Sequence, residues 1–173
     1  ALDWQLPVSF PMTLTGEFMF NKVVSGVTID NINIENTMNW KRFRGADNRF
    51  IYPSNYAIHS RKNAVVLTNT NKGYGYTANI TLNAQPVRNL DIMVAYTMTE
   101  SKEVSGLPGS DPVSTWQGLI TIDGPNFGTV QRSQYVVPHR LIASVNYFLP
   151  FKIFGGKGLH LNLFYSGSSG SGY

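Results

Sequence analysis

The chain has 173 residues, with 14% charged and 13% aromatic side chains and a formal net charge of +4. The charged fraction is well below the roughly 25% of ordinary soluble domains, and the net charge is too small to indicate a nucleic-acid partner. The sequence has no cysteine, which excludes a disulfide framework and a thiolate metal site. It also has no apolar run of the roughly 20 residues that a membrane-spanning helix needs.

Alternating side chains near the N-terminus predict the first strands. Residues 1–11 are expected to hold the end of one strand and then a turn, after which alternate residues over 12–20 are apolar. The phase of this alternation shifts near Ser25 and Gly26. The shift predicts one long strand over residues 12–36 with a β-bulge near Ser25, or alternatively a hairpin turn at Ser25-Gly26.

A polar segment over residues 41–63 is predicted to be a long loop, and a basic aromatic cluster stands at its start. Cations interleaved with aromatic rings can bind single-stranded nucleic acid. They suit a membrane interface better, because cations there meet anionic lipid head groups. A solvated loop entry with no specific partner is the alternative. The candidate contacts to lipopolysaccharide phosphates are Lys41, Arg42 and Arg44.

The clearest strand pattern covers residues 73–85. One parity is apolar, including Tyr76, Ile80 and Leu82, and the other is polar and uncharged. A strand that faces bulk water usually carries charges, whereas neutral polar side chains inside and apolar ones outside are typical of an outer-membrane barrel. The side chains predicted to face a barrel lumen are Thr77, Asn79, Thr81, Asn83 and Gln85.

The second half of the chain predicts three more strands, with short and long connections in alternation. The predicted strands are residues 90–99, residues 139–148 and the segment from Leu159 onward. The predicted connections are short turns at 85–89 and 150–158 and a long loop over 101–137 that is rich in Gly, Pro, Ser and Asp. Outer-membrane barrels have short periplasmic turns and long extracellular loops. Residues 41–63 and 101–137 are therefore predicted on one side and residues 86–89 on the other. No helical period is found.

No residue pattern indicates an enzyme. The three histidines lie far apart in the sequence and lack metal-ligand spacing. Residues 73–78 match the dinucleotide fingerprint Gly-x-Gly-x-x-Ala, but that fingerprint opens a helix, and here a strand is predicted to follow. We therefore expect no catalytic residue, no cofactor and no metal site.

A succession of short motifs runs along most of the chain. They are Glu-Phe-Met-Phe-Asn at 17–21, Thr-Ile-Asp-Asn-Ile-Asn-Ile at 28–34, Ala-Asp-Asn-Arg-Phe-Ile-Tyr at 46–52, Leu-Thr-Asn-Thr-Asn-Lys-Gly-Tyr-Gly-Tyr at 67–76, Val-Pro-His-Arg-Leu-Ile-Ala-Ser-Val-Asn-Tyr at 137–147 and Phe-Tyr-Ser-Gly at 164–167. In this order, the motifs resemble bacterial TonB-dependent outer-membrane receptors, most closely the Oar-like group of Bacteroidetes.

The resemblance implies an antiparallel transmembrane β-barrel of about 22 strands, with an N-terminal plug in its lumen. Residues 1–173 have room for about five to six strands. They are expected to be an internal segment of one barrel domain, without the plug, in the bacterial outer membrane. The implied partners are the remainder of the barrel and its plug, the TonB complex through the missing N-terminal part, outer-membrane lipid and a surface lipoprotein.

Three functions are compatible with the sequence. The first, implied by the resemblance, is part of a TonB-dependent active transporter that imports a nutrient. The second is a passive pore or adhesive outer-membrane barrel, which would use the same strands without an energised plug. The third is a soluble all-β binding module such as a sandwich, which predicts charges on the polar faces, and these are scarce.

Overall fold

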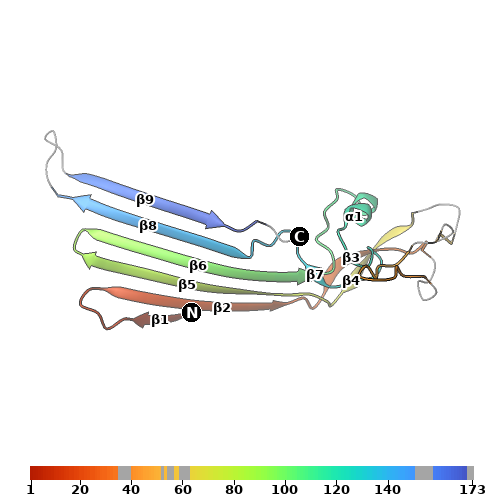
Figure 1. The fold of residues 1–173 in the computed structure, drawn as a ribbon, viewed down its shortest axis with the longest axis horizontal. Helices are drawn as coiled ribbons and strands as arrows, with labels where there is room; N and C mark the ends of the chain where they lie inside the picture. Colours follow the sequence, from red (N-terminus) through yellow and green to blue (C-terminus); the bar gives the residue numbers. More distant parts are fainter. Residues whose placement is uncertain (35–39, 52, 54–56, 59–62, 151–157, 171–173) are drawn as a thin grey trace. The chain divides into compact units, whose positions relative to one another are not determined.

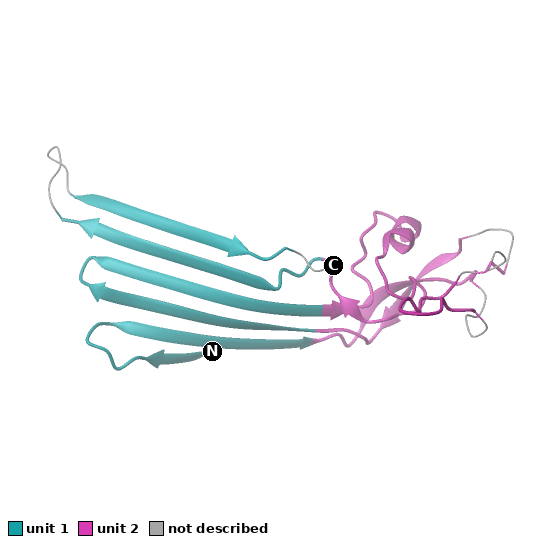
Figure 2. Ribbon diagram, in the orientation of Figure 1, with its two compact units in different colours: residues 1–21, 75–101, 135–173 teal, residues 22–74, 102–134 magenta. Residues whose placement is uncertain are grey.

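The computed structural model describes residues 1–173 except 35–39, 52, 54–56, 59–62, 151–157 and 171–173. The predicted all-β class with antiparallel pairing is confirmed, and the sheets are open rather than closed. The chain forms two compact units (Figure 2). Unit 1 comprises residues 1–21, 75–101 and 135–173, and unit 2 comprises residues 22–74 and 102–134. The assignment of residues 1–173 to one barrel domain stays a prediction.

Unit 1 contains most of a sheet that is built largely from long neighbouring strands (Figure 1). Their order is β1 (Leu2–Gln5), β2 (Met12–Lys22), β5 (Tyr74–Val87), β6 (Leu90–Glu103), β8 (His139–Leu149) and β9 (Leu159–Ser168). A short β7 (Gln131–Arg132) pairs with the last two residues of β6. The strands predicted over residues 90–99 and 139–148 and from Leu159 are therefore confirmed, and β6 extends further than predicted.

The short connections lie at one end of this sheet. The turn predicted over residues 85–89 is confirmed, although β5 continues through Val87 and leaves only Arg88 and Asn89 between the strands. Because consecutive strands run antiparallel, the connections β1–β2 and β5–β6 share this end with the last residues of β8 and the first residues of β9 (Figure 1). Most of the turn predicted over residues 150–158 lies outside the described residues. The longer segments that join β2 to β5 and β6 to β8 leave and re-enter the sheet at its opposite end.

The register places apolar and polar side chains on opposite faces of the sheet. Tyr96 pairs with Leu141, and Leu90 with Tyr147, so the apolar parities of β6 and β8 coincide. The Phe18 ring stacks on the Tyr76 ring with centroids 6.4 Å apart, which places the apolar parities of β2 and β5 on one face. The other face carries polar contacts. Thr97 Oγ1 donates to Asn79 Oδ1 (3.1 Å), Thr15 Oγ1 donates to Asp3 Oδ1 (2.7 Å), and Asn162 Nδ2 donates to Asn146 Oδ1.

Unit 2 is organised around a two-stranded sheet of β3 (Gly26–Asn31) and β4 (Val65–Thr70). Ile29 and Asn31 on β3 are its most deeply buried side chains, at 0% and 1% exposure. Neither prediction for the phase shift near Ser25 is correct. The strand is not continuous, because β2 ends at Lys22 and β3 begins at Gly26, and there is no hairpin at Ser25-Gly26, because β3 pairs with β4 and not with β2.

Residues 101–137 contain regular structure where a long loop without a helix was predicted. The helix α1 (Pro112–Gly118) begins after Asp111, whose Oδ1 accepts hydrogen bonds from the backbone N–H groups of Val113 (2.9 Å) and Ser114 (3.0 Å). These bonds, first those with Ser114, lower the pKa of Asp111. The helix escaped prediction because seven residues are too few to show an apolar period. Its signal is local: an N-cap Asp followed directly by Pro.

Gly73 occupies the break between β4 and β5 with a φ of +123°, a conformation that side chains disfavour. A Cβ at this position would stand 3.0 Å from Lys102 O and 3.1 Å from Val23 Cγ2. We expect Gly73→Ala to destabilise the protein by about 1–3 kcal/mol, because strain and crowding add. Chemical unfolding should detect this loss, with Gly16→Ala as the matched control, because a Cβ at Gly16 meets nothing within 4 Å. Equal stability of the two variants would contradict the strain that we expect from a side chain at position 73.

Candidate functional site

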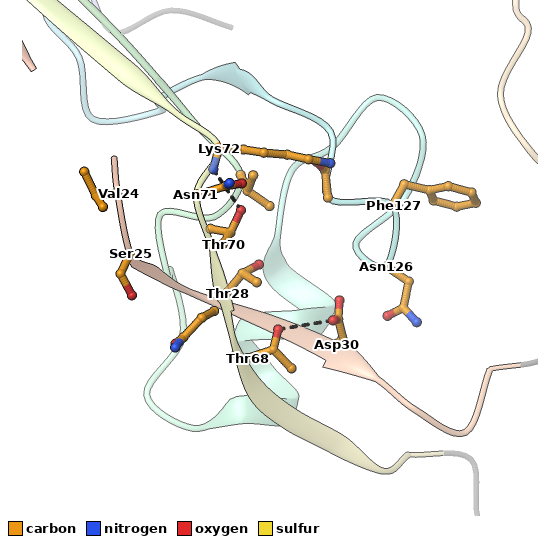
Figure 3. A pocket seen from close by; sticks show the side chains of 13 residues that line it. Val24, Ser25, Thr28, Asp30, Thr68, Thr70, Asn71, Lys72, Asn126 and Phe127 are labelled. Carbon is orange, nitrogen blue, oxygen red and sulfur yellow. Dashed lines mark hydrogen bonds between the residues drawn. The ribbon is translucent and has the colours of Figure 1, made fainter. Parts of the chain in front are cut away.

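A cavity in unit 2 lies beside the β3–β4 sheet (Figure 3). Its volume is about 520 Å³, within the usual range of small-molecule sites. Three segments that are distant in sequence line it: residues 24–30, residues 68–72 and residues 126–128, with Val104 beside them. Hydroxyl and amide side chains dominate this lining, which suits a polar ligand.

Threonines from both strands form one wall of the cavity. Thr28 and Thr68 are directly opposite each other in the β3–β4 register, and Thr70 lies opposite Gly26. Asp30 follows Thr28 on the same face of β3, and its Oδ2 accepts a hydrogen bond from Thr68 Oγ1 (3.2 Å; Figure 3). Thr28 is only 7% exposed, yet its hydroxyl has no hydrogen-bond partner among the residues that the structure describes. Because Thr28 lines the cavity, its hydroxyl is available to a ligand there as donor or acceptor.

Lys72 supplies a positive charge to the same cavity. Its side chain extends toward the 126–128 segment, where Nζ donates to Gly128 O (3.2 Å) (Figure 3). Its backbone N–H donates to Thr70 Oγ1 (3.2 Å), which fixes the start of the side chain. Within the described parts of the chain, neither Lys72 nor Asp30 forms an ion pair. The cavity thus contains one cation and one anion that do not neutralise each other.

A hydrogen-bond network centred on Asn126 holds the third segment against β3. Asn126 Oδ1 accepts from the backbone N–H of Asn31 (2.8 Å), and Asn126 Nδ2 donates to Asn31 O (2.8 Å). The same Oδ1 accepts from Trp116 Nε1 of α1 (2.7 Å). Asn31 Oδ1 in turn accepts from the backbone N–H of Ala64 (3.1 Å). One amide therefore joins β3, α1 and the 126–128 segment.

The predicted basic cluster lies partly in an aromatic stack. The Arg42 guanidinium carbon stands 3.6 Å from the centroid of the Phe50 ring, which stacks on Phe127 with centroids 4.5 Å apart. Arg42 Nη1 also donates to Asn48 O (2.7 Å) and lies 3.7 Å from Asp123 Oδ1. Arg42 and Phe50 also form an antiparallel backbone bridge, so the predicted long loop begins with a small hairpin. Arg42 packs within unit 2, and its contact with a lipid head group stays a prediction.

The other cationic side chains of this hairpin differ in whether they form a salt bridge. Arg49 forms an ion pair with Asp47 (2.8 Å), and hydrogen bonds from the Arg49 side chain, above all, lower the pKa of Asp47 to about 2. Lys41 and Arg44 are exposed, and neither makes a salt bridge with any residue placed in the structure. They remain the two candidates with a free charge for an anionic lipid.

The five predicted lumen residues lie on β5 at alternate positions. Asn79 Nδ2 donates to Thr81 Oγ1 (3.4 Å), and Gln85 Nε2 donates to Asp91 Oδ1 of β6 (3.1 Å). They therefore share a polar face with β6, while their orientation toward a lumen stays a prediction. Residues 74–78 of the dinucleotide fingerprint belong to the strand β5, so the fingerprint lacks the helix that it requires.

Sequence reasoning missed the cavity residues Thr28, Asp30, Lys72 and Asn126. Only the β3–β4 pairing and the return of residues 126–128 bring them together, and these contacts leave no local signal. Among the described residues, no group of three or more acidic or histidine side chains is placed to hold a metal ion. No helix in the described parts of the chain has the length and apolar character needed to cross a membrane. Comparison of the chain with protein-family models, curated proteins and solved structures gave no match.

Proposed function

We propose that the sheet of unit 1 is part of the wall of an outer-membrane β-barrel, and that the chain belongs to a TonB-dependent active transporter that imports a nutrient. The observation that carries this proposal is the exposed apolar face of the sheet. Phe18 is 68% exposed, Ile80 55% and Leu163 71%, although all three belong to the apolar parity. A water-soluble sandwich would cover such a face with a second layer, whereas lipid covers it in a membrane.

The lengths of the strands support a transmembrane role. A transmembrane β-strand needs about 9–11 residues, and β2, β8 and β9 have 11, 11 and 10 residues. The apolar parity of these strands carries no charge between Met12 and Phe20, between Leu141 and Leu149, or between Leu159 and Gly167. Each strand is thus long enough, and apolar enough on one face, to cross the hydrocarbon layer.

Ionisable side chains on the apolar parity begin at one end of the sheet. Lys22 follows Phe20 on β2, Glu100 follows Met98 on β6, and His139 precedes Leu141 on β8. Tyr96 lies at this end of β6, and its hydroxyl is 2.7 Å from His139 Nδ1. Tyrosines followed by charges are typical of the interface between hydrocarbon and head groups. We place one membrane surface at this level.

The edges of the sheet support an assignment to a larger barrel. In the part of the chain that the structure describes, β9 pairs only with β8, and the four-residue β1 covers only the first part of β2. Unpaired backbone N–H and C=O groups cost several kcal/mol each in lipid. These edges therefore require further strands, which the remainder of the barrel would supply. The plug, the TonB complex and a surface lipoprotein are the other partners proposed from the resemblance.

Labelling of single cysteines on intact cells tests the membrane assignment. In the full natural polypeptide, in a cysteine-free background, we expect a membrane-impermeant thiol reagent to label Arg44→Cys and Ser110→Cys. Both positions are exposed and lie in the predicted extracellular segments. Arg88→Cys, in the turn between β5 and β6, should react only after the outer membrane is permeabilised. Labelling of Arg88→Cys alone would reverse the orientation, and equal labelling of all three variants would exclude the membrane assignment.

A further inference from the structure

We propose that the cavity of unit 2 binds a short peptide with free termini, whose ammonium group meets Asp30 and whose carboxylate meets Lys72. The site would be additional to the barrel wall, since every residue that lines it belongs to unit 2. Its ligand need not be the transported nutrient. The proposal therefore holds whether or not the sheet of unit 1 crosses a membrane.

The two unneutralised charges are the first reason for this ligand. Asp30 has only the neutral Thr68 hydroxyl as a side-chain partner, and Lys72 Nζ has only the neutral carbonyl of Gly128. A simple anion would satisfy Lys72 and leave Asp30 unmatched, and a simple cation would do the reverse. A neutral sugar would match neither charge. A zwitterion neutralises both, and charge-assisted hydrogen bonds are about twice as strong as neutral ones.

The separation of the charges favours a peptide over a free amino acid. The Asp30 carboxylate is hydrogen-bonded to Thr68, two residues before the end of β4 at Thr70. Two strand residues span about 7 Å, and Lys72 lies two residues further along the chain, with its Nζ at Gly128 O. The two charges of a free amino acid flank a single carbon, whereas an extended tripeptide spans about 10 Å. A ligand of about three residues is therefore the best match.

The neutral lining matches the backbone of such a ligand. Each peptide unit offers one N–H donor and one carbonyl acceptor. The Thr28 hydroxyl can serve as donor or acceptor. The side chains of Asn69 and Asn71 also line the cavity, and each offers an N–H donor and a carbonyl acceptor. None of these three side chains has a hydrogen-bond partner among the residues that the structure places. A bound peptide would supply the Thr28 hydroxyl with a hydrogen-bond partner.

Calorimetric titration of the full natural polypeptide in detergent with triglycine tests the proposal without any mutation. We expect triglycine to bind, and N-acetyl-triglycine and triglycine amide, which each lack one charge, to bind about tenfold more weakly. Equal affinities for the three ligands would overturn the proposal. So would binding of maltotriose without binding of triglycine, because the cavity would then recognise hydroxyl groups rather than charges.

Paired variants assign each terminus to its residue. Asp30→Asn should weaken triglycine about tenfold and leave the affinity for N-acetyl-triglycine unchanged, because that ligand has no ammonium group to lose. Lys72→Gln should weaken triglycine about tenfold and leave the affinity for triglycine amide unchanged, because that ligand has no carboxylate to lose. The matched controls are Asp3→Asn and Lys41→Gln, which lie outside the cavity lining and should bind like the unmodified protein. Loss of affinity that is the same for all three ligands would overturn the assignment of the termini.

Discussion

Replacing Ile80 with arginine should destabilise the protein in a bilayer by about 2–4 kcal/mol, and replacing the adjacent Thr81 should cost less. Ile80 lies on the apolar face of β5 and is 55% exposed. A guanidinium at this position would enter hydrocarbon if the sheet is part of a barrel wall. Thr81 lies on the opposite face, where its loss removes only a long hydrogen bond from Asn79 (3.4 Å).

The measurement is the free energy of unfolding in lipid vesicles, with both variants made in the full natural polypeptide. A soluble domain predicts a different result, because an arginine at an exposed position in water changes stability by no more than about 0.5 kcal/mol. Similar unfolding free energies for Ile80→Arg and Thr81→Arg would therefore contradict the membrane assignment. The comparison is informative because the two positions are neighbours on one strand and differ only in the face they occupy.

The strands of unit 1 could be predicted from the sequence because their pattern is local. Each has one apolar and one polar parity, and period-two alternation identifies a strand without knowledge of its partners. The start of β8 at His139 and of β9 at Leu159 followed from this alternation. The break between β2 and β3 did not follow, because a phase shift looks the same whether it marks a bulge, a turn or a change of partner strand.

Unit 2 was largely beyond prediction because distant segments make its contacts. Asn126 is 95 residues from Asn31 in sequence, and nothing near either residue indicates that the other is its partner. The basic cluster illustrates the same limit. Its composition indicated an anionic partner for Arg42, and the structure adds a ring partner, Phe50, that a return of the chain brings into contact. Asp30 and Lys72, too, share a cavity only through the β3–β4 pairing.

Asn126→Ala should strongly destabilise unit 2. The substitution removes two hydrogen bonds to the backbone of Asn31, a residue that is 1% exposed, and one from Trp116 Nε1. Each buried polar group left without a partner costs about 1–3 kcal/mol. Water that enters the space left by the side chain would replace some of the lost hydrogen bonds, so the total loss of stability is expected to be about 3–5 kcal/mol. Few single substitutions cost as much.

Two further variants separate the parts of this network. Trp116→Phe removes only the bond from the indole N–H to Asn126 Oδ1 and should cost about 1 kcal/mol. Asn71→Ala is the matched control, since Asn71 also lines the cavity but has no hydrogen-bond partner among the described residues. It should leave stability within about 0.5 kcal/mol of the unmodified protein.

Hydrogen exchange at the amides of β3 and β4 is the appropriate measurement, because it reports local opening of unit 2 even when unit 1 remains folded. Asn126→Ala should speed exchange across Gly26–Asn31 and Val65–Thr70 by about a hundredfold or more, as a loss of about 3 kcal/mol requires. Exchange in β8 and β9 should not change, because those strands belong to unit 1. Unchanged exchange in β3 would show that this amide is not what holds the 126–128 segment, and acceleration across both units would show that the two do not open independently.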